Sequence, residues 1–199
     1  MEPTVSAIVL AAGLSSRMGR VKQLLLLARK PVIRHCLDAL LDSGIRDILV
    51  VIGPQHEEIV KRLQGLPVRI AVNETPNSEM ADSLRIGLRA LGLAQTGVLV
   101  CLSDHPLVSA MTIRALADAY RDSPDRIIIP VYGGRRGHPA LFPIAMISDI
   151  FSGMTLRDIV QNNSRSVLTI NVDDEGVLLD LDTEEDYRAM QKKFMPHAS

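Results

Sequence analysis

The sequence predicts an α/β fold, a three-layer Rossmann-like sandwich whose central sheet is mostly parallel. Short apolar runs recur along the chain, and each is bounded by Gly, Pro, Asp or Asn. Segments with the apolar period of an α-helix lie between these runs. Most of the runs are apolar on both faces rather than alternating, which is typical of parallel strands covered by helices on both sides.

Predicted strands and helices alternate through about the first 125 residues. The most clearly bounded helix spans 31–43, because Pro31 suits the first turn and Gly44 lies just past the end. A chain of this alternation forms parallel strands joined by right-handed crossovers. Strands are predicted at 7–11, 48–52, 68–72, 98–102 and 127–130, and further helices at 55–63, 81–91 and 111–120.

The pattern changes after Pro130. A turn-rich segment occupies 132–143, and the closing helix is predicted at 184–194. Thr183 with Asp186 three residues later has the pattern of a helix N-cap. The remaining elements predicted in this part are short helices near 146–151 and 156–162 and a strand at 167–172. No linker, repeat or low-complexity tract divides the chain, so we interpret 1–199 as one domain.

Composition and charge exclude several protein classes. Hydrophobic residues make up 47% and charged residues 23% of the chain, which is a globular balance. With 22 basic and 23 acidic side chains, the chain has no polybasic surface for nucleic acid. The N-terminal apolar run has no basic leader and is too short to cross a bilayer, so we expect a cytoplasmic protein. Cys36 and Cys101 lie separately in apolar stretches, and we expect two buried thiols.

The segment LAAGLSSRMGRVK, residues 10–22, follows the first strand directly, where open α/β sheets hold their ligands. Its small residues let backbone N–H groups approach an anion, and its arginine and lysine suit a triphosphate. The segment is neither a Walker loop nor a GxGxxG fingerprint. It therefore predicts a local nucleoside triphosphate site. The residues expected to form this site are Leu10, Ala11, Ala12, Gly13, Ser15, Ser16, Arg17 and Lys22.

Acidic residues at two positions are candidate ligands for Mg²⁺. Asp104 ends the apolar run VLVCL, so its carboxylate should face the same crevice as the first loop. A turn before the next helix would explain Asp104 as well. Asp180 and Asp182 alternate along an extended segment, and either could complete the site. Capping of the last helix explains Asp182 equally well.

The first loop resembles the LAAGxSxRMGxxK signature of MobA-like nucleotidyltransferases, which act in molybdenum cofactor maturation. The resemblance continues through SLRIGL at 83–88, SDHP at 103–106, GRRGHPALF at 134–142 and DLDTEEDY at 180–187. It implies a fold of the nucleotide-diphospho-sugar transferase type. It also implies a molybdenum cofactor cytidylyltransferase, which joins CMP from CTP to the phosphate of molybdopterin and releases pyrophosphate with the help of Mg²⁺.

The resemblance also implies roles for residues outside the first loop. Ser83 joins the nucleotide site, Asp104 is the main metal ligand, and Asp182 is favoured as the second. Gly137 and His138 contact the acceptor; without the resemblance, they would be interpreted as part of a basic hairpin turn. Residues 1–125 then form a nucleotide-binding half, and residues 126–199 form an acceptor-binding half.

The expected mechanism is an in-line attack by the acceptor phosphate on the α-phosphorus, with Arg17, Lys22 and Asp104 as the catalytic residues. Ala12 favours CTP, since guanylyl relatives tend to have LAGG where this chain has LAAG. Two alternatives stay open. One is a transferase of the same fold that uses GTP or a sugar phosphate. The other is a non-catalytic nucleotide-binding protein that delivers cofactor through a transient contact with a molybdenum enzyme.

Overall fold

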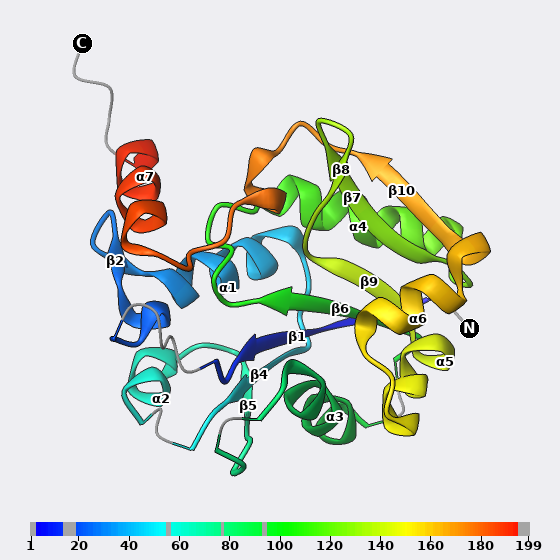
Figure 1. Ribbon diagram of the computed structural model, residues 1–199, viewed down its shortest axis with the longest axis horizontal. Helices are drawn as coiled ribbons and strands as arrows, with labels where there is room; N and C mark the ends of the chain where they lie inside the picture. Colours follow the sequence, from blue (N-terminus) through cyan, green and yellow to red (C-terminus); the bar gives the residue numbers. More distant parts are fainter. Residues whose placement is uncertain (1–2, 14–18, 55–56, 77, 93–94, 195–199) are drawn as a thin grey trace.

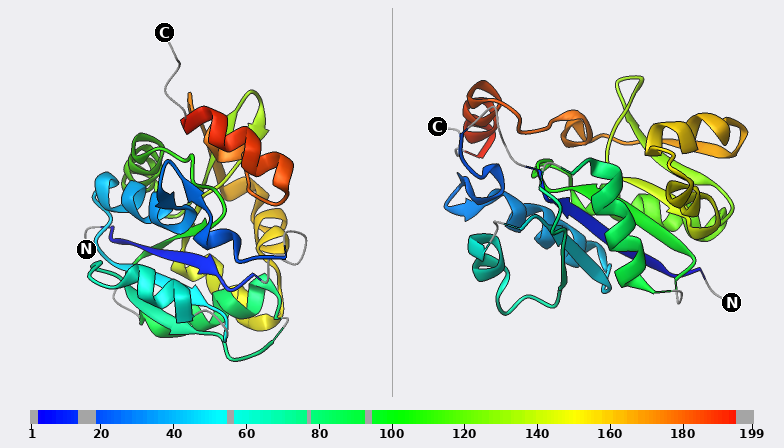
Figure 2. Two further views of the ribbon diagram at one scale, coloured as in Figure 1. Left: turned by 90° about the vertical axis from the view of Figure 1, so that its left-hand side faces the viewer. Right: turned by 60° about the horizontal axis from the view of Figure 1, so that its bottom comes forward.

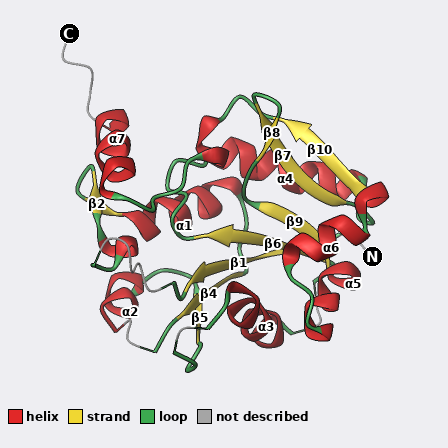
Figure 3. Cartoon of the chain, viewed as in Figure 1, coloured by secondary structure: helices red, strands yellow, loops and turns green. Residues whose placement is uncertain are grey.

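The structure, a computed structural model, describes residues 3–13, 19–54, 57–76, 78–92 and 95–194. An eight-stranded sheet lies at its centre, with helices on both faces (Figures 1 and 3). The strand order is β10-β7-β9-β6-β1-β4-β5, and β8 pairs with β7 outside this path. The predicted three-layer α/β fold is therefore confirmed.

The parallel part of the sheet contains the strands that the apolar runs predict. β1 lies between β6 and β4 and is parallel to both, and β10 is parallel to β7. Their bounds are β1 (Val5–Ala11), β4 (Ile48–Ile52), β5 (Arg69–Val72), β6 (Gly97–Leu102), β7 (Ile127–Tyr132) and β10 (Val167–Asn171). β5 forms one edge, which is why Ile70 and Val72 stay 38% and 42% exposed.

One central strand differs from the sequence prediction. β9 (Ala140–Pro143) lies inside the segment predicted to be turns, between β6 and β7, and runs antiparallel to both. All of its residues are buried. Together with the short β8 (Arg135–Arg136), it returns the chain to the middle of the sheet. The turn-rich prediction was wrong here because β9 is short and begins directly after a proline, which masks its strand pattern.

The helices divide between the two faces according to alternate side chains of the strands. On β1, Ala7 and Val9 belong to the core on one face, and Ile8 and Leu10 to the core on the other. The first face is covered by α1 (Val32–Ser43), α2 (Glu57–Leu63) and α4 (Ala110–Asp122), and the second by α3 (Met80–Leu91), α5 (Ile144–Ile147) and α6 (Leu156–Asn162). Gly44 ends α1 with φ 96°, as its position in the sequence predicts.

The last helix lies away from the sheet, beside a small hairpin (Figure 2). The hairpin pairs β2 (Leu26–Leu27) with β3 (Lys30–Pro31), and α7 (Glu184–Phe194) packs on it through Leu27 and Met190. The N-cap prediction for α7 is confirmed: the Asp186 N–H donates to Thr183 Oγ1 at 3.1 Å, and the Thr183 N–H donates to the Asp186 carboxylate at 2.8 Å.

Short 3₁₀ turns complete the chain: η1 (Lys22–Leu24), η2 (Ser148–Ser152), η3 (Ser164–Ser166) and η4 (Glu175–Leu178). The helix predicted at 146–151 is divided between α5 and η2. Within the part of the chain that the structure describes, every helix is too short or too polar to cross a membrane.

Candidate active site

Three charged side chains meet at the carboxyl end of the central strands. Lys22 Nζ donates to Asp104 Oδ2 at 2.6 Å and to Asp182 Oδ1 at 2.7 Å. Lys22 and Asp104 are largely buried, and Asp182 is 36% exposed. These are residues that the sequence predicts from three separate segments, and the fold brings them together around one ammonium group.

Backbone contacts hold the three segments in place. Asp104 follows β6, and its carbonyl oxygen accepts the Leu181 N–H at 2.9 Å, which places Asp182 beside it. Lys22 begins η1 on the other side of the crevice. An ion pair between Arg20 and Glu184 ties the end of the first loop to the start of α7. The closing segment therefore completes the site that β1 and β6 begin.

The electrostatics of the cluster favour a charged Lys22. Burial works against the ammonium form, but the Asp104 and Asp182 carboxylates outweigh burial and raise the pKa of Lys22 above its usual value. One oxygen of the cluster has no such partner, since Asp104 Oδ1 is buried and accepts no hydrogen bond from the described residues. A buried carboxylate oxygen without a donor is a position that a cation would satisfy.

The donor set fits a Mg²⁺ ion that arrives with a triphosphate. Asp104 and Asp182 already converge on one positive group, and Mg²⁺ needs only one or two protein carboxylates when phosphate oxygens and waters fill its other positions. Among the described residues, no group of three or more His, Cys, Asp or Glu side chains forms a site that could hold a metal without a substrate. Of the two alternating aspartates, Asp182 binds Lys22, and Asp180 is exposed.

A cavity of about 550 Å³, measured with its open mouth, begins at this cluster. Its lining includes six of the residues predicted for the nucleotide and the metal: Leu10, Ala12, Gly13, Lys22, Ser83 and Asp104. The Ala11 side chain packs instead into the core beneath α1. Predicted residues Ser15, Ser16 and Arg17 lie outside the described residues. The sequence and the fold thus agree on one crevice at the end of β1.

Sequence reasoning missed Asn73, which shapes the wall of this cavity. Asn73 follows β5 and is fully buried, and its side-chain amide donates to Ser83 Oγ at 3.0 Å and to Ser78 Oγ at 2.7 Å. These bonds hold the start of α3 against the cavity. An amide residue directly after an apolar run was the available signal, because such residues line the carboxyl edge of a parallel sheet.

Gly137 and His138, the predicted acceptor residues, lie at a second and larger cavity of about 1360 Å³, again measured with its open mouth. Gly137 is required by packing: a Cβ at this position would lie 2.4 Å from the Val177 carbonyl oxygen. The His138 N–H donates to that same carbonyl group at 2.8 Å. Met80 lines this cavity and the first one, so the two are neighbours.

The surroundings of the His138 imidazole disfavour its charged form. Burial, assisted by His105, lowers its pKa against the opposing effect of the Asp104 and Asp180 carboxylates. The His105 and His138 rings meet edge to face, with centroids 5.4 Å apart. His138 therefore connects the turn that carries Asp104 to the second cavity.

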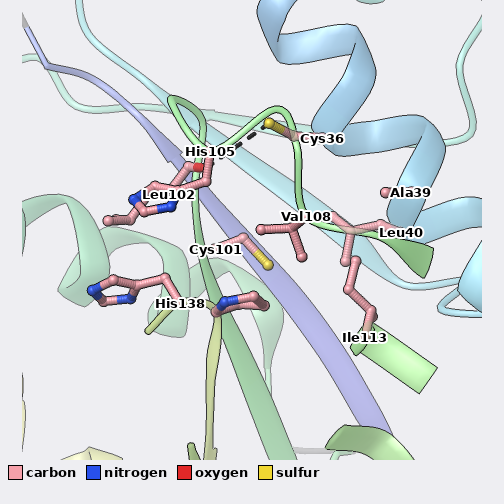
Figure 4. Close-up of a pocket in the computed structure, with 10 residues that line it drawn as sticks. Cys36, Ala39, Leu40, Cys101, Leu102, His105, Val108, Ile113 and His138 are labelled. Carbon is pink, nitrogen blue, oxygen red and sulfur yellow. Dashed lines mark hydrogen bonds between the residues drawn. The ribbon is translucent and has the colours of Figure 1, made fainter. Parts of the chain in front are cut away.

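Figure 4 shows a small apolar pocket behind this turn, with Cys36, Cys101, His105 and His138 in its lining. Both thiols are free and buried, as predicted, and burial raises the pKa of each. The Cys36 thiol donates to the Ser103 carbonyl oxygen at 3.5 Å. This bond links Cys36 on α1 to the turn that presents Asp104.

Comparison with known proteins gives one family and several relatives. The model of the MobA-like NTP transferase domain matches residues 7–168. Nicotine blue oxidoreductase of Paenarthrobacter nicotinovorans is 29% identical over 94% of this chain and 97% of its own length. The bifunctional protein GlmU of Clavibacter sepedonicus is 30% identical over 61% of the chain, and the matched segment spans only 25% of that relative.

Solved structures give the same architecture. The crystal structure of Rv0371c from Mycobacterium tuberculosis H37Rv superposes with a TM-score of 0.81 and 25% identity, covering 96% of this chain and 99% of that protein. Rv0371c has also been crystallised in complex with manganese. The match to the family model spans both Lys22 and Asp104.

Proposed function

Because the chain belongs to the MobA-like NTP transferase family, we propose that this nucleotidyltransferase moves CMP from CTP to the phosphate of molybdopterin and releases pyrophosphate. The observation that carries the proposal is the position of Lys22, which binds Asp104 and Asp182 and lines the first cavity, a neighbour of the second through Met80. A nucleotide in the first cavity would present its α-phosphorus there. An acceptor in the second cavity would reach it past Met80.

Lys22 has two sets of anionic partners in this proposal. Without substrate, its ammonium neutralises Asp104 and Asp182. With the triphosphate bound, Lys22 turns to the phosphate oxygens and stabilises the charge that grows on them as the α-phosphorus is attacked. Asp104 and Asp182 would then hold Mg²⁺, which when bound supplies a Lewis acid for the phosphate oxygens. Arg17, outside the described residues, is proposed to assist Lys22.

The chemistry needs no protein nucleophile. A phosphate oxygen of the acceptor forms the new bond to the α-phosphorus, and the bond from the α-phosphorus to the bridging oxygen breaks, so that pyrophosphate leaves with the bonding electrons. An acceptor phosphate is already anionic near neutral pH, so positioning and electrostatics supply the catalysis. The neutral imidazole of His138 and the backbone at Gly137 would orient the acceptor.

Each of the two cavities is lined mainly by one part of the chain. Residues that line the first cavity all come from 10–104, and most that line the second come from 129–161. This distribution supports the proposal that 1–125 binds the nucleotide and 126–199 the acceptor within one domain. Release of the product to a molybdenum enzyme through a transient contact is part of the same proposal.

Pyrophosphate release tests the proposal directly. The purified protein is given CTP or GTP with Mg²⁺, and either molybdopterin or a sugar 1-phosphate as the acceptor. We expect rapid pyrophosphate release only in the reaction that contains both CTP and molybdopterin. Release with GTP or with the sugar phosphate would assign the chain to another transferase of the same fold. Binding of CTP without release under any of these conditions would favour the delivery role.

The relative named nicotine blue oxidoreductase motivates a further arm of this experiment. An oxidoreductase needs a reductant, and the first loop has no GxGxxG fingerprint for a nicotinamide dinucleotide. We therefore expect no bleaching of nicotine blue when the protein is mixed with reduced nicotinamide dinucleotide. Bleaching at a rate above that of pyrophosphate release would replace the transferase proposal.

A further inference from the structure

The larger cavity is lined by residues of the sheet, among them residues of β9, and by residues of α6. One wall is the sheet, through Val100 on β6, Ile129 on β7 and Phe142 on β9. Another wall is α6, through Leu156 and Val160. Leu156 and Val160 pack against the core cluster that contains these sheet residues, so the cavity has a continuous apolar surface on which a flat ring could lie.

The polar side chains that line this cavity are basic or neutral. Arg157 and Gln161 are one helical turn apart on α6 and therefore project from the same face of the helix. Arg136 comes to the same cavity from β8. No residue that lines the cavity is acidic, in contrast with the first cavity, where Glu79 and Asp104 are part of the wall.

Some arginines on the described surface have an acidic partner and others, such as Arg46 and Arg188, do not; both arginines of the cavity belong to the second group. Arg34, Arg69 and Arg85 each form an ion pair with an aspartate. In the part of the chain that the structure describes, the guanidinium groups of Arg136 and Arg157 neither donate a hydrogen bond nor form an ion pair with another side chain. The charge of Arg157 does help to lower the pKa of the adjacent Asp158, whose carboxylate accepts hydrogen bonds from Thr155. Two guanidinium groups without a carboxylate partner, above apolar walls, suit an anionic ligand.

We infer that this cavity binds a flat heteroaromatic ring that carries an anionic or acceptor-rich edge, and that Arg157 and Gln161 on α6 recognise that edge. The inference rests on the proposed function, because the ligand would be the body of the phosphate acceptor. The His138 and Met80 side of the cavity adjoins the nucleotide cavity, so the reacting phosphate lies there. The α6 side then holds the opposite end of the acceptor and determines which acceptor is used.

A binding experiment with a fluorescent probe tests this assignment without turnover. The probe is pterin-6-carboxylate, a flat heterocycle with one carboxylate. Replacement of Arg157 and Gln161 by alanine together should weaken binding of the probe at least about tenfold, because charge-assisted hydrogen bonds are lost. The matched control is Arg165→Ala: this exposed arginine lies just beyond α6, and its carbonyl oxygen accepts a hydrogen bond from Arg126, which the substitution keeps.

Kinetics then separate recognition of the acceptor from damage to the fold. The double variant should raise the acceptor KM by a similar factor, while the CTP KM stays within about twofold of the wild-type value. The assignment is overturned if the wild-type protein does not bind the probe, or if the double variant binds it as tightly as Arg165→Ala does. Arg157-dependent binding of the probe without any transfer to molybdopterin would overturn the proposed function and leave the cavity assignment standing.

Discussion

The two cavities of the proposed active site handle charge in opposite ways. In the first cavity, proposed for the nucleotide and called the nucleotide cavity below, the ammonium group of Lys22 is already neutralised by Asp104 and Asp182. In the second cavity, proposed for the acceptor and called the acceptor cavity below, Arg136 and Arg157 form no hydrogen bond or ion pair with a described carboxylate, and no acidic residue lines the wall. In the first cavity, Lys22 can exchange its two carboxylate partners for phosphate oxygens when a triphosphate and its cation enter together. The second is ready to take an anion directly.

The largest expected effect is on the cation side of the nucleotide cavity. Asp104→Asn removes a negative charge but keeps the size of the side chain, and turnover should fall on the order of 100-fold or more at limiting Mg²⁺. Asp182→Asn should cost about tenfold, since the more exposed Asp182 side chain is more readily replaced by water. Pyrophosphate release at varied Mg²⁺ measures both variants.

The matched control for these variants is Asp180→Asn, which changes an exposed carboxylate two residues from Asp182. Its turnover should stay near that of the wild-type protein. If Asp104→Asn keeps near-normal turnover at limiting Mg²⁺, the turn at 103–106 is structural, and the cation must be sought elsewhere.

Lys22→Ala tests the exchange of partners. Turnover should fall about 100-fold while the half-saturating CTP concentration changes little, because the charge acts mainly in the transition state. Arg17→Ala should follow the same pattern. In the absence of nucleotide, Lys22→Ala should also bind Mn²⁺ more tightly than the wild-type protein, since no ammonium then competes for the two carboxylates. The electron paramagnetic resonance signal of free Mn²⁺ reports this binding.

Lys30→Ala serves as the control for Lys22→Ala, because Lys30 forms a comparable ion pair with Asp38 away from the cavity. Its turnover and Mn²⁺ binding should match the wild-type values. A loss confined to CTP affinity, with the maximal rate intact, would make Lys22 a ground-state binding residue.

A smaller effect is expected on the choice of base. A methyl group at Ala12 crowds a purine more than a pyrimidine, so CTP should be preferred over GTP by about 1–3 kcal/mol in kcat/KM. Ala12→Gly should reduce the ratio of kcat/KM for CTP to kcat/KM for GTP. Competition between the two nucleotides in one reaction measures it, and faster use of GTP by the wild-type protein would refute the prediction.

The smallest effect concerns His138 in the acceptor cavity. His138→Ala should raise the acceptor KM about two- to tenfold through the loss of one hydrogen bond, with the CTP value unchanged. Burial lowers the pKa of His138 below its ordinary value of 6.5, so the imidazole is neutral above that pH. The acceptor KM should therefore stay flat from about pH 6.5 to 8. A KM that rises as pH increases through 6.5 would show that the imidazolium form binds the acceptor.

The nucleotide cavity was visible in the sequence because its residues occupy one short loop and the ends of apolar strands. Position after a strand was enough to predict Lys22 and Asp104 in one crevice, since parallel strands end at the same edge. Asn73 escaped notice because its role depends on a fully buried amide that holds Ser83, and burial is set by tertiary packing.

The acceptor cavity was harder to predict for a physical reason. Its walls come from β6, β7, β9 and α6, and the position of β9 follows from antiparallel pairing that no local pattern specifies. The sequence alone indicates that Arg157 is an ordinary exposed helical arginine, because its position at the cavity depends on how α6 packs against the sheet. The choice between Asp180 and Asp182 depended in the same way on the contact between Leu181 and Asp104.

The place of β9 in the sheet also imposes an order on synthesis at the ribosome. β6 and β7 both emerge before β9, yet β9 must lie between them. Until residues 140–143 have left the exit tunnel, β6 is an open edge made of Val98, Leu99 and Val100, and such edges recruit strands from other chains. A recombinant fragment that stops at residue 125 would leave that edge of β6 permanently unpaired, so expression trials should begin from chains that continue through β10.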